Sequence, residues 1–79
     1  MKINILFFGA TADLTGSRRI ERTVNSPISA GDVLRQVNDE FPDLKGHKLL
    51  FAVNEEYAAP GSILREGDEL AIFTAVSGG

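Results

Sequence analysis

Residues 29–41, SAGDVLRQVNDEF, predict the helix that decides the fold. Its apolar side chains recur at helical spacing and therefore share one face: Val33, Leu34, Val37 and Phe41. Ser29 and Asp32 have the spacing of a capping box, in which the hydroxyl accepts an orphan backbone N–H and the acid favours the positive end of the helix dipole. Pro42 disfavours helical geometry at the residue before it and so ends the helix. This amphipathic helix needs an apolar surface to cover.

Strand patterns on both sides of the helix supply that surface. The first runs over residues 2–8, where Ile3, Ile5 and Phe7 alternate with other side chains up to Gly9. The other predicted segments are a short helical turn or loop at 10–16, an edge strand at 17–24, a loop at 43–48, a strand at 49–54, a connection at 55–62, a turn at Ile63-Leu64 packed on the core, a turn at 65–69 and a last strand at 70–76. The element order allows one further short strand between those at 49–54 and 70–76. One helix packed on one sheet makes an α+β two-layer domain.

Length, charge and composition narrow the classes of function. The chain has 79 residues, enough for one small domain with a single core. Its net charge is −3 and its only basic run is Arg18-Arg19, which argues against nucleic acid or an acidic membrane surface as a partner. The absence of cysteine excludes disulfides, thiolate metal sites and a cysteine nucleophile. No apolar stretch approaches the ~20 residues that span a bilayer, so we expect a cytoplasmic protein.

Few side chains are candidates for chemistry. His47 is the only histidine and lies in a predicted loop without a second ligand nearby, so we expect a solvated residue and no metal site. The carboxylate pairs Glu55-Glu56 and Asp68-Glu69 lie in predicted turns or connections, where we also expect solvated residues. The residues therefore predict no self-sufficient active site.

The end of the chain is less ordinary. The sequence closes on AVSGG, residues 75–79, directly after the last predicted strand. Glycine loses more conformational freedom on ordering than other residues, so Gly78 and Gly79 are unfavourable beside a strand. They are favoured there only if the chain must fit a space too narrow for a Cβ atom. Fully extended, residues 75–79 would span about 17 Å. Such a tail could thread a narrow channel in another protein and deliver its carboxyl group, or it could be a frayed end or an expression remnant.

Three segments carry a resemblance to a known family. ILFFGATADLTG (5–16), LLFAVN (49–54) and GDELAIFTAVSGG (67–79) resemble the small, sulfur-carrying subunits of molybdopterin synthase, in the ubiquitin-like sulfur carrier family. The resemblance covers essentially the whole chain. It implies a ubiquitin-like β-grasp domain over residues 1–74, with a mixed sheet of four to five strands, its first and last strands adjacent and parallel, on one main helix. Residues 75–79 would then form an extended tail.

The resemblance also implies a mechanism with no bound cofactor. An activating enzyme would use ATP to adenylate the carboxyl group of Gly79, and a sulfur donor would displace AMP to leave a thiocarboxylate. The tail residues Val76, Ser77 and Gly78 would then thread into the large synthase subunit, within a heterotetramer. There the sulfur would pass to precursor Z to build the dithiolene of molybdopterin.

Alternation along the strands predicts a surface for that partner. If Leu70 and Ile72 face the helix, then Phe73 points to the opposite face of the sheet, and Leu6 and Phe8 do the same on the first strand. These three apolar residues are the predicted partner-binding patch. The alternative is that loops cover them.

Other functions remain compatible with the sequence. A carrier for thiamine synthesis or tRNA thiolation, or a ubiquitin-like protein modifier, would share the activation of Gly79 and differ only afterwards. An interaction module with an inert C-terminus is a different class. Loss of the last glycine would leave such a module unaffected and would disable a carrier.

Overall fold

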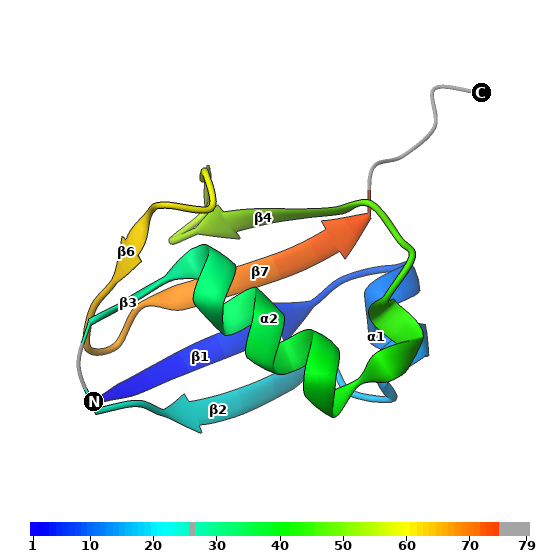
Figure 1. The fold of residues 1–79 in the computed structure, drawn as a ribbon, viewed down its shortest axis with the longest axis horizontal. Helices are drawn as coiled ribbons and strands as arrows, with labels where there is room; N and C mark the ends of the chain where they lie inside the picture. The colour runs from blue at the N-terminus through cyan, green and yellow to red at the C-terminus, as the bar shows by residue number, and fades with distance from the viewer. Residues whose placement is uncertain (26, 75–79) are drawn as a thin grey trace.

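The computed structural model describes residues 1–25 and 27–74 and has one helix-covered sheet (Figure 1). Its elements are β1 (Lys2–Phe7), α1 (Ala10–Thr15), β2 (Arg19–Thr23), β3 (Ile28–Ser29), α2 (Ala30–Glu40), the 3-10 helix η1 (Pro42–Leu44), β4 (Leu49–Val53), β5 (Glu56–Tyr57), β6 (Ile63–Leu64) and β7 (Glu69–Thr74). Five strands form a mixed sheet in the order β2-β1-β7-β4-β5, and β3 pairs with β6 in a separate two-stranded sheet. The predicted α+β two-layer domain is confirmed.

The centre of the sheet is a parallel pair made by the two ends of the sequence. Strand β1 runs parallel to β7, with Ile5 opposite Leu70 and Phe7 opposite Ile72. Strand β2 adds antiparallel to β1, and β4 adds antiparallel to β7. The predicted alternation holds on both central strands, because the side chains directed toward α2 are buried: Ile3, Ile5, Phe7, Leu70 and Ile72.

Helix α2 covers this inner face as the sequence predicts. The backbone N–H of Asp32 donates to Ser29 Oγ at 3.1 Å, which satisfies one of the helix's unpaired N–H groups. Val33 and Val37 are fully buried against the sheet. Phe41 follows the helix and its ring meets that of Phe7 edge-on, with centroids 5.8 Å apart. The capping residue and the apolar stripe therefore set both the start and the packing of the helix.

The segment predicted as a connection at residues 55–62 contains strand β5, a short strand that the element order allowed but did not place. Val53 pairs with Glu56 and Ala52 with Tyr57, which leaves Asn54 and Glu55 as a two-residue hairpin turn. Both turn residues have positive φ, 50° at Asn54 and 71° at Glu55, as in a type I′ turn. The usual glycine is replaced by Glu55, so the hairpin signal was missing from the sequence.

The amide of Asn54 anchors this turn to the start of β7. Its Oδ1 accepts from the N–H of Glu69 at 3.0 Å, and its Nδ2 donates to Asp68 Oδ1 at 3.1 Å. The other oxygen of Asp68 accepts from the N–H of Arg65 at 2.7 Å. The side chains of Asn54 and Asp68 therefore hold two turns together at one end of the sheet.

Two further segments differ from their prediction. Leu44, in the segment predicted as a loop, lies in η1 and is fully buried. Ile63 and Leu64, predicted as a turn, form β6 and pair with β3, with Leu64 fully buried and Ile63 about half exposed at 49%. Neither segment is long enough to show a period, so the sequence could not distinguish loop from paired strand there.

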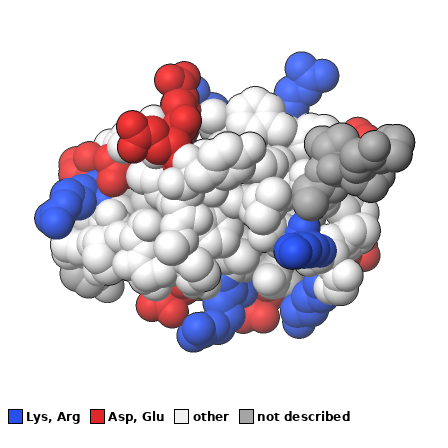
Figure 2. Space-filling model, turned by 90° about the horizontal axis from the view of Figure 1, so that it is seen from above, with Lys and Arg blue, Asp and Glu red and all other residues white. Residues whose placement is uncertain are grey.

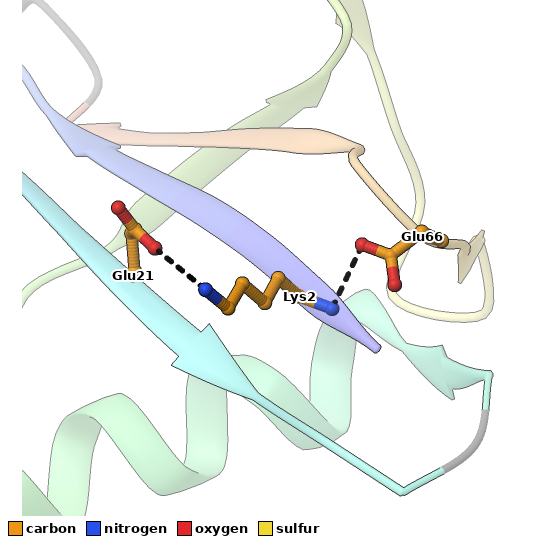
Figure 3. A network of polar contacts seen from close by, with 3 residues as sticks. All are labelled: Lys2, Glu21 and Glu66. Atoms are coloured by element: carbon orange, nitrogen blue, oxygen red, sulfur yellow. Dashed lines mark hydrogen bonds and ion pairs between the residues drawn. The ribbon is translucent and has the colours of Figure 1, made fainter.

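The sheet edges are short or charged. Strand β2 exposes Arg19, Glu21 and Thr23, and β5 has only two residues. Lys2 ties the start of β1 to its surroundings: its Nζ lies 4.0 Å from Glu21 Oε2, and its backbone N–H donates to Glu66 Oε2 at 3.0 Å (Figure 3). Such edges are poor templates for pairing with another chain.

Thr11 is the one buried polar side chain among the described residues, and it joins α1 to the sheet. Its hydroxyl oxygen lies 2.7 Å from the carbonyl oxygen of Ile72 and 2.8 Å from that of Phe8, and its single proton can be donated to either carbonyl. It also accepts from the N–H of Phe8 at 3.0 Å. One hydroxyl thus binds the ends of both central strands to helix α1.

Thr11→Val should lower the free energy of unfolding by about 1–2 kcal/mol, because the shape is kept and the hydrogen bonds are lost. Thr23→Val is the matched control: Thr23 is exposed on β2, and the change there should stay within about 0.5 kcal/mol. Urea denaturation of both variants measures the difference. Equal stability of Thr11→Val and the unmodified chain would contradict the role of the hydroxyl.

Glu55→Gly should raise the free energy of unfolding by about 0.5–1 kcal/mol. Relief of the left-handed conformation at φ 71° gains roughly 1–2 kcal/mol, offset by the greater backbone entropy that glycine loses on folding. Glu56→Gly, one residue later in β5, should be destabilising by about 0.5–1 kcal/mol because it only adds that entropy cost. Urea midpoints that shift in the same direction for both variants would refute the turn assignment.

Candidate functional site

The predicted tail begins where the described residues end. Val76, Ser77, Gly78 and Gly79 lie outside the described residues, as does the end of the strand predicted to reach residue 76. The structure therefore describes the strand that leads to the tail, and the roles of the four tail residues stay predictions.

The end of β7 is held on three sides. Thr74 pairs with Leu49 of β4, and the carbonyl oxygen of Ile72 accepts from the N–H of Phe8 at 3.3 Å at the end of β1. On the third side, the Thr11 hydroxyl of α1 reaches the same carbonyl at 2.7 Å. The last described strand therefore leaves the domain from a fixed position, because three separate elements constrain it.

The outer face of the sheet, opposite α2, brings the predicted partner residues together. Leu6, Phe8 and Phe73 share one hollow of about 380 Å³, whose other lining residues are Ala52, Glu55, Tyr57, Glu69 and Ala71. Phe8 is 53% exposed, a large value for a phenylalanine in a folded domain. The described residues thus leave Phe8 accessible, although the partner that the patch binds stays a prediction.

Tyr57 is a member of this face that sequence reasoning missed. It is 82% exposed, and its ring meets Phe73 edge-on with centroids 5.8 Å apart. Through the strand registers it closes a row that crosses the whole sheet: Arg19, Leu6, Ala71, Ala52 and Tyr57. Recognition of the two-residue turn before β5 would have placed Tyr57 on the outer face by alternation.

A second hollow adjoins the first. It measures about 570 Å³ and is lined by Leu6, Phe7, Phe8, Gly9, Ala12, Asp13, Arg18 and Arg19. Leu6 and Phe8 belong to both hollows and therefore form the ridge between them. We call the first the acidic hollow, for Glu55 and Glu69, and the second the basic hollow, for Arg18 and Arg19.

Charged side chains surround the uncharged surface. In a view onto the β4 side, uncharged atoms fill the middle, and acidic side chains gather at the end where β4 ends and β7 begins (Figure 2, upper left). His47 is exposed, and the described residues contain no group of three or more His, Asp or Glu suited to a metal ion. Within the same residues, no helix has the length and apolarity to cross a membrane.

Comparison with known proteins gives concordant matches. The model of the ThiS family matches residues 5–79. The molybdopterin synthase sulfur carrier subunit of Mycobacterium tuberculosis is 32% identical over 82 residues, covering all of this chain and 99% of that protein. The human protein of the same name is 30% identical over 99% of this chain, and that of Drosophila ananassae is 38% identical over all of it.

Solved structures share the fold. SAMP1 of Haloferax volcanii, a small archaeal modifier protein, matches with a TM-score of 0.86 at 29% identity, over all of both chains. A complex of subunits 1 and 2 of the molybdopterin-converting factor from Helicobacter pylori contains a chain that matches with a TM-score of 0.69 at 23% identity. The predicted ubiquitin-like β-grasp fold is confirmed. Matching both the family model over residues 5–79 and whole relatives at 30% identity or more, the chain belongs to the ThiS family.

Proposed function

We propose that this chain is the sulfur carrier subunit of a molybdopterin synthase. The observation that carries the proposal is that relatives of that name match this chain along its length. The alignment with the Mycobacterium tuberculosis protein covers 100% of this chain and 99% of that protein. The fold adds a physical reason, because β7 ends at Thr74 beside an apolar outer face. A partner that covers this face would receive the residues that follow β7.

The chemistry of the proposed site is that of a backbone carboxyl group. The chain has no cysteine on which to hold transferable sulfur, so we assign the sulfur to the carboxyl group of Gly79. A carboxylate resists nucleophiles until it carries a good leaving group. In the proposal, an oxygen of Gly79 attacks the α-phosphorus of ATP on an activating enzyme and releases pyrophosphate. Hydrosulfide from a sulfur donor then attacks the acyl carbon, the new C–S bond replaces the bond to AMP, and AMP leaves with its electron pair, which gives the thiocarboxylate.

The proposed partner is the large subunit of the synthase, docked on the outer face. Leu6, Phe8 and Phe73 offer the apolar centre that such interfaces bury, and Tyr57 is of a residue type enriched in them. The tail residues Val76, Ser77 and Gly78 would thread toward the active site of that subunit. The sulfur would be transferred there to precursor Z within a heterotetramer.

A second candidate function has a specific observation in its favour. SAMP1 of Haloferax volcanii matches over all of both chains at 29% identity. A modifier would use the same activated Gly79 but would form an isopeptide bond to a lysine of another protein. Recovery of this chain linked to such a lysine from its own cells would favour the modifier. Recovery only as a free thiocarboxylate would favour the sulfur carrier.

Removal of Gly79 should abolish sulfur loading and leave the fold intact. A terminal glycine contributes little packing, so we expect the free energy of unfolding to change by less than about 0.5 kcal/mol. The readout is the mass of the C-terminal peptide after incubation with ATP, a sulfur source and the host's activating enzymes. In the unmodified chain we expect one oxygen to be replaced by sulfur. This mass gain must be located on the Gly78-Gly79 fragment, because oxidation of Met1 would give nearly the same gain in the intact protein. An unmodified terminus under these conditions would favour an inert interaction module.

Phe73→Asp should weaken binding to the large subunit by about 100-fold or more, because it places a charge in the centre of the apolar patch. Ile63→Asp is the matched control, since Ile63 has similar apolar character and 49% exposure but lies on β6, outside this hollow. Calorimetric titration with the purified large subunit measures both affinities, and urea denaturation verifies that both variants fold. Equal losses of affinity in the two variants would argue against a specific patch.

A further inference from the structure

The ridge of Leu6 and Phe8 separates surfaces of opposite charge. The acidic hollow on one side carries Glu55 and Glu69 and no basic side chain. The basic hollow on the other side carries Arg18 and Arg19, with Asp13 as its only acid. Because both hollows share the ridge, a partner that covers Phe8 meets both sets of charges.

These charges are not neutralised within the described part of the chain. Glu55, Glu69, Arg18 and Arg19 make no ion pair within 4.0 Å among residues 1–25 and 27–74. Nearby charges are engaged: Lys2 Nζ pairs with Glu21, and the backbone N–H of Lys2 donates to the carboxylate of Glu66 (Figure 3). The unpaired charges therefore flank the ridge, whereas Glu21 on β2 and Glu66, between β6 and β7, are engaged.

The two sets of charges also lie too far apart to neutralise each other. Arg19 lies on β2 and Glu69 on β7, with β1 between them, and Glu55 lies one strand farther on, in the turn that follows β4. At about 4.8 Å per strand spacing, the sheet separates Arg19 from Glu69 by roughly 10 Å and from Glu55 by roughly 14 Å or more. The Debye length at physiological salt is about 8 Å, so each charge acts locally on whatever covers it.

We propose that the docking face of the large subunit carries a cationic side chain that enters the acidic hollow and a carboxylate that meets Arg18 and Arg19, on either side of an apolar centre over Phe8. The identity of this partner rests on the proposed function. A partner turned half-way round on the same apolar centre would bring like charges together, which costs several kcal/mol in such interfaces. The polarity of the face therefore fixes the orientation in which the carrier docks, and with it the direction in which β7 ends.

The test inverts the polarity without altering the net charge. Arg19→Glu combined with Glu55→Lys exchanges the sign of one charge in each hollow and keeps the total at −3. Arg35→Glu with Asp39→Lys is the matched control, because both residues are exposed on α2, on the other side of the sheet. Stopped-flow measurements with the purified large subunit give the association rate constant at about 0.01 M salt, where the Debye length is ~30 Å, and at about 1 M, where it is ~3 Å.

We expect the inverted variant to associate about 10-fold or more slowly at low salt, with the difference shrinking at high salt, and the control to stay within about 2-fold. Each single change, Arg19→Glu and Glu55→Lys, should slow association by itself. If one single change slows association and the other speeds it, the partner's face has one sign of charge and the proposal is wrong.

The remaining outcomes separate this proposal from the proposed function. If the inverted variant binds like the unmodified chain while Phe73→Asp loses binding, the large subunit still docks on the apolar centre and only the polarity is refuted. If the unmodified chain does not bind the large subunit at all, both proposals fail. Self-association of the chain through this face, detected by sedimentation and removed by Phe73→Asp, would assign the complementary charges to a second copy and overturn the proposal.

Discussion

The parallel pairing of β1 with β7 is the interaction on which the rest of the structure depends. It joins Asn4 to Glu69 and Phe7 to Ile72, residues 65 positions apart, so the whole intervening chain must close as a loop before the pair can form. Strands β2 and β4 flank this pair on either side, and α2 covers the row of side chains that the pair buries. The same pairing creates the outer face, because Leu6 and Ala71 become neighbours through it.

The two faces of the sheet have different roles, stability on the inner face and recognition on the outer face. The inner face, with Ile5 and Leu70, is fully buried under α2 and supplies stability. The outer face, with Phe8 and Phe73, remains accessible among the described residues and supplies recognition. In the proposed mechanism no side chain of this protein performs chemistry. The domain needs only to present a carboxyl group and to be recognised, which fits a chain this small.

Sequence reasoning succeeded where a local period or a local cap decides the structure. The hydroxyl of Ser29 and the spacing of Val33 and Val37 predicted α2, and alternation correctly placed Phe8 and Phe73 on the outer face. These features depend on neighbours within one turn or one strand, so a single segment contains the whole signal.

It failed where the deciding partner lies far along the chain or the usual residue is replaced. The hydroxyl of Thr11 finds its acceptor at Ile72, 61 residues away. Leu44 is a single apolar residue in a polar segment, so the segment has no hydrophobic periodicity from which its burial could be predicted. Glu55 stands where a two-residue hairpin normally has glycine, which concealed β5 and Tyr57. The polarity of the outer face was equally hidden, since Arg19 and Glu55 become ends of one surface only after the strands are ordered.

The charge and length of the edge strands affect how the free chain, without a partner, associates with other copies. A face that exposes Phe8 and Tyr57 is a hazard in a crowded solution, where strand-to-strand growth leads to insoluble polymers. Such growth needs an open, long and uncharged edge. Strand β2 ends the sheet with exposed Arg19 and Glu21, and β5 ends it after two residues. The charges of β2 and the shortness of β5 therefore disfavour strand-to-strand growth in a domain whose outer face leaves Phe8 and Tyr57 exposed.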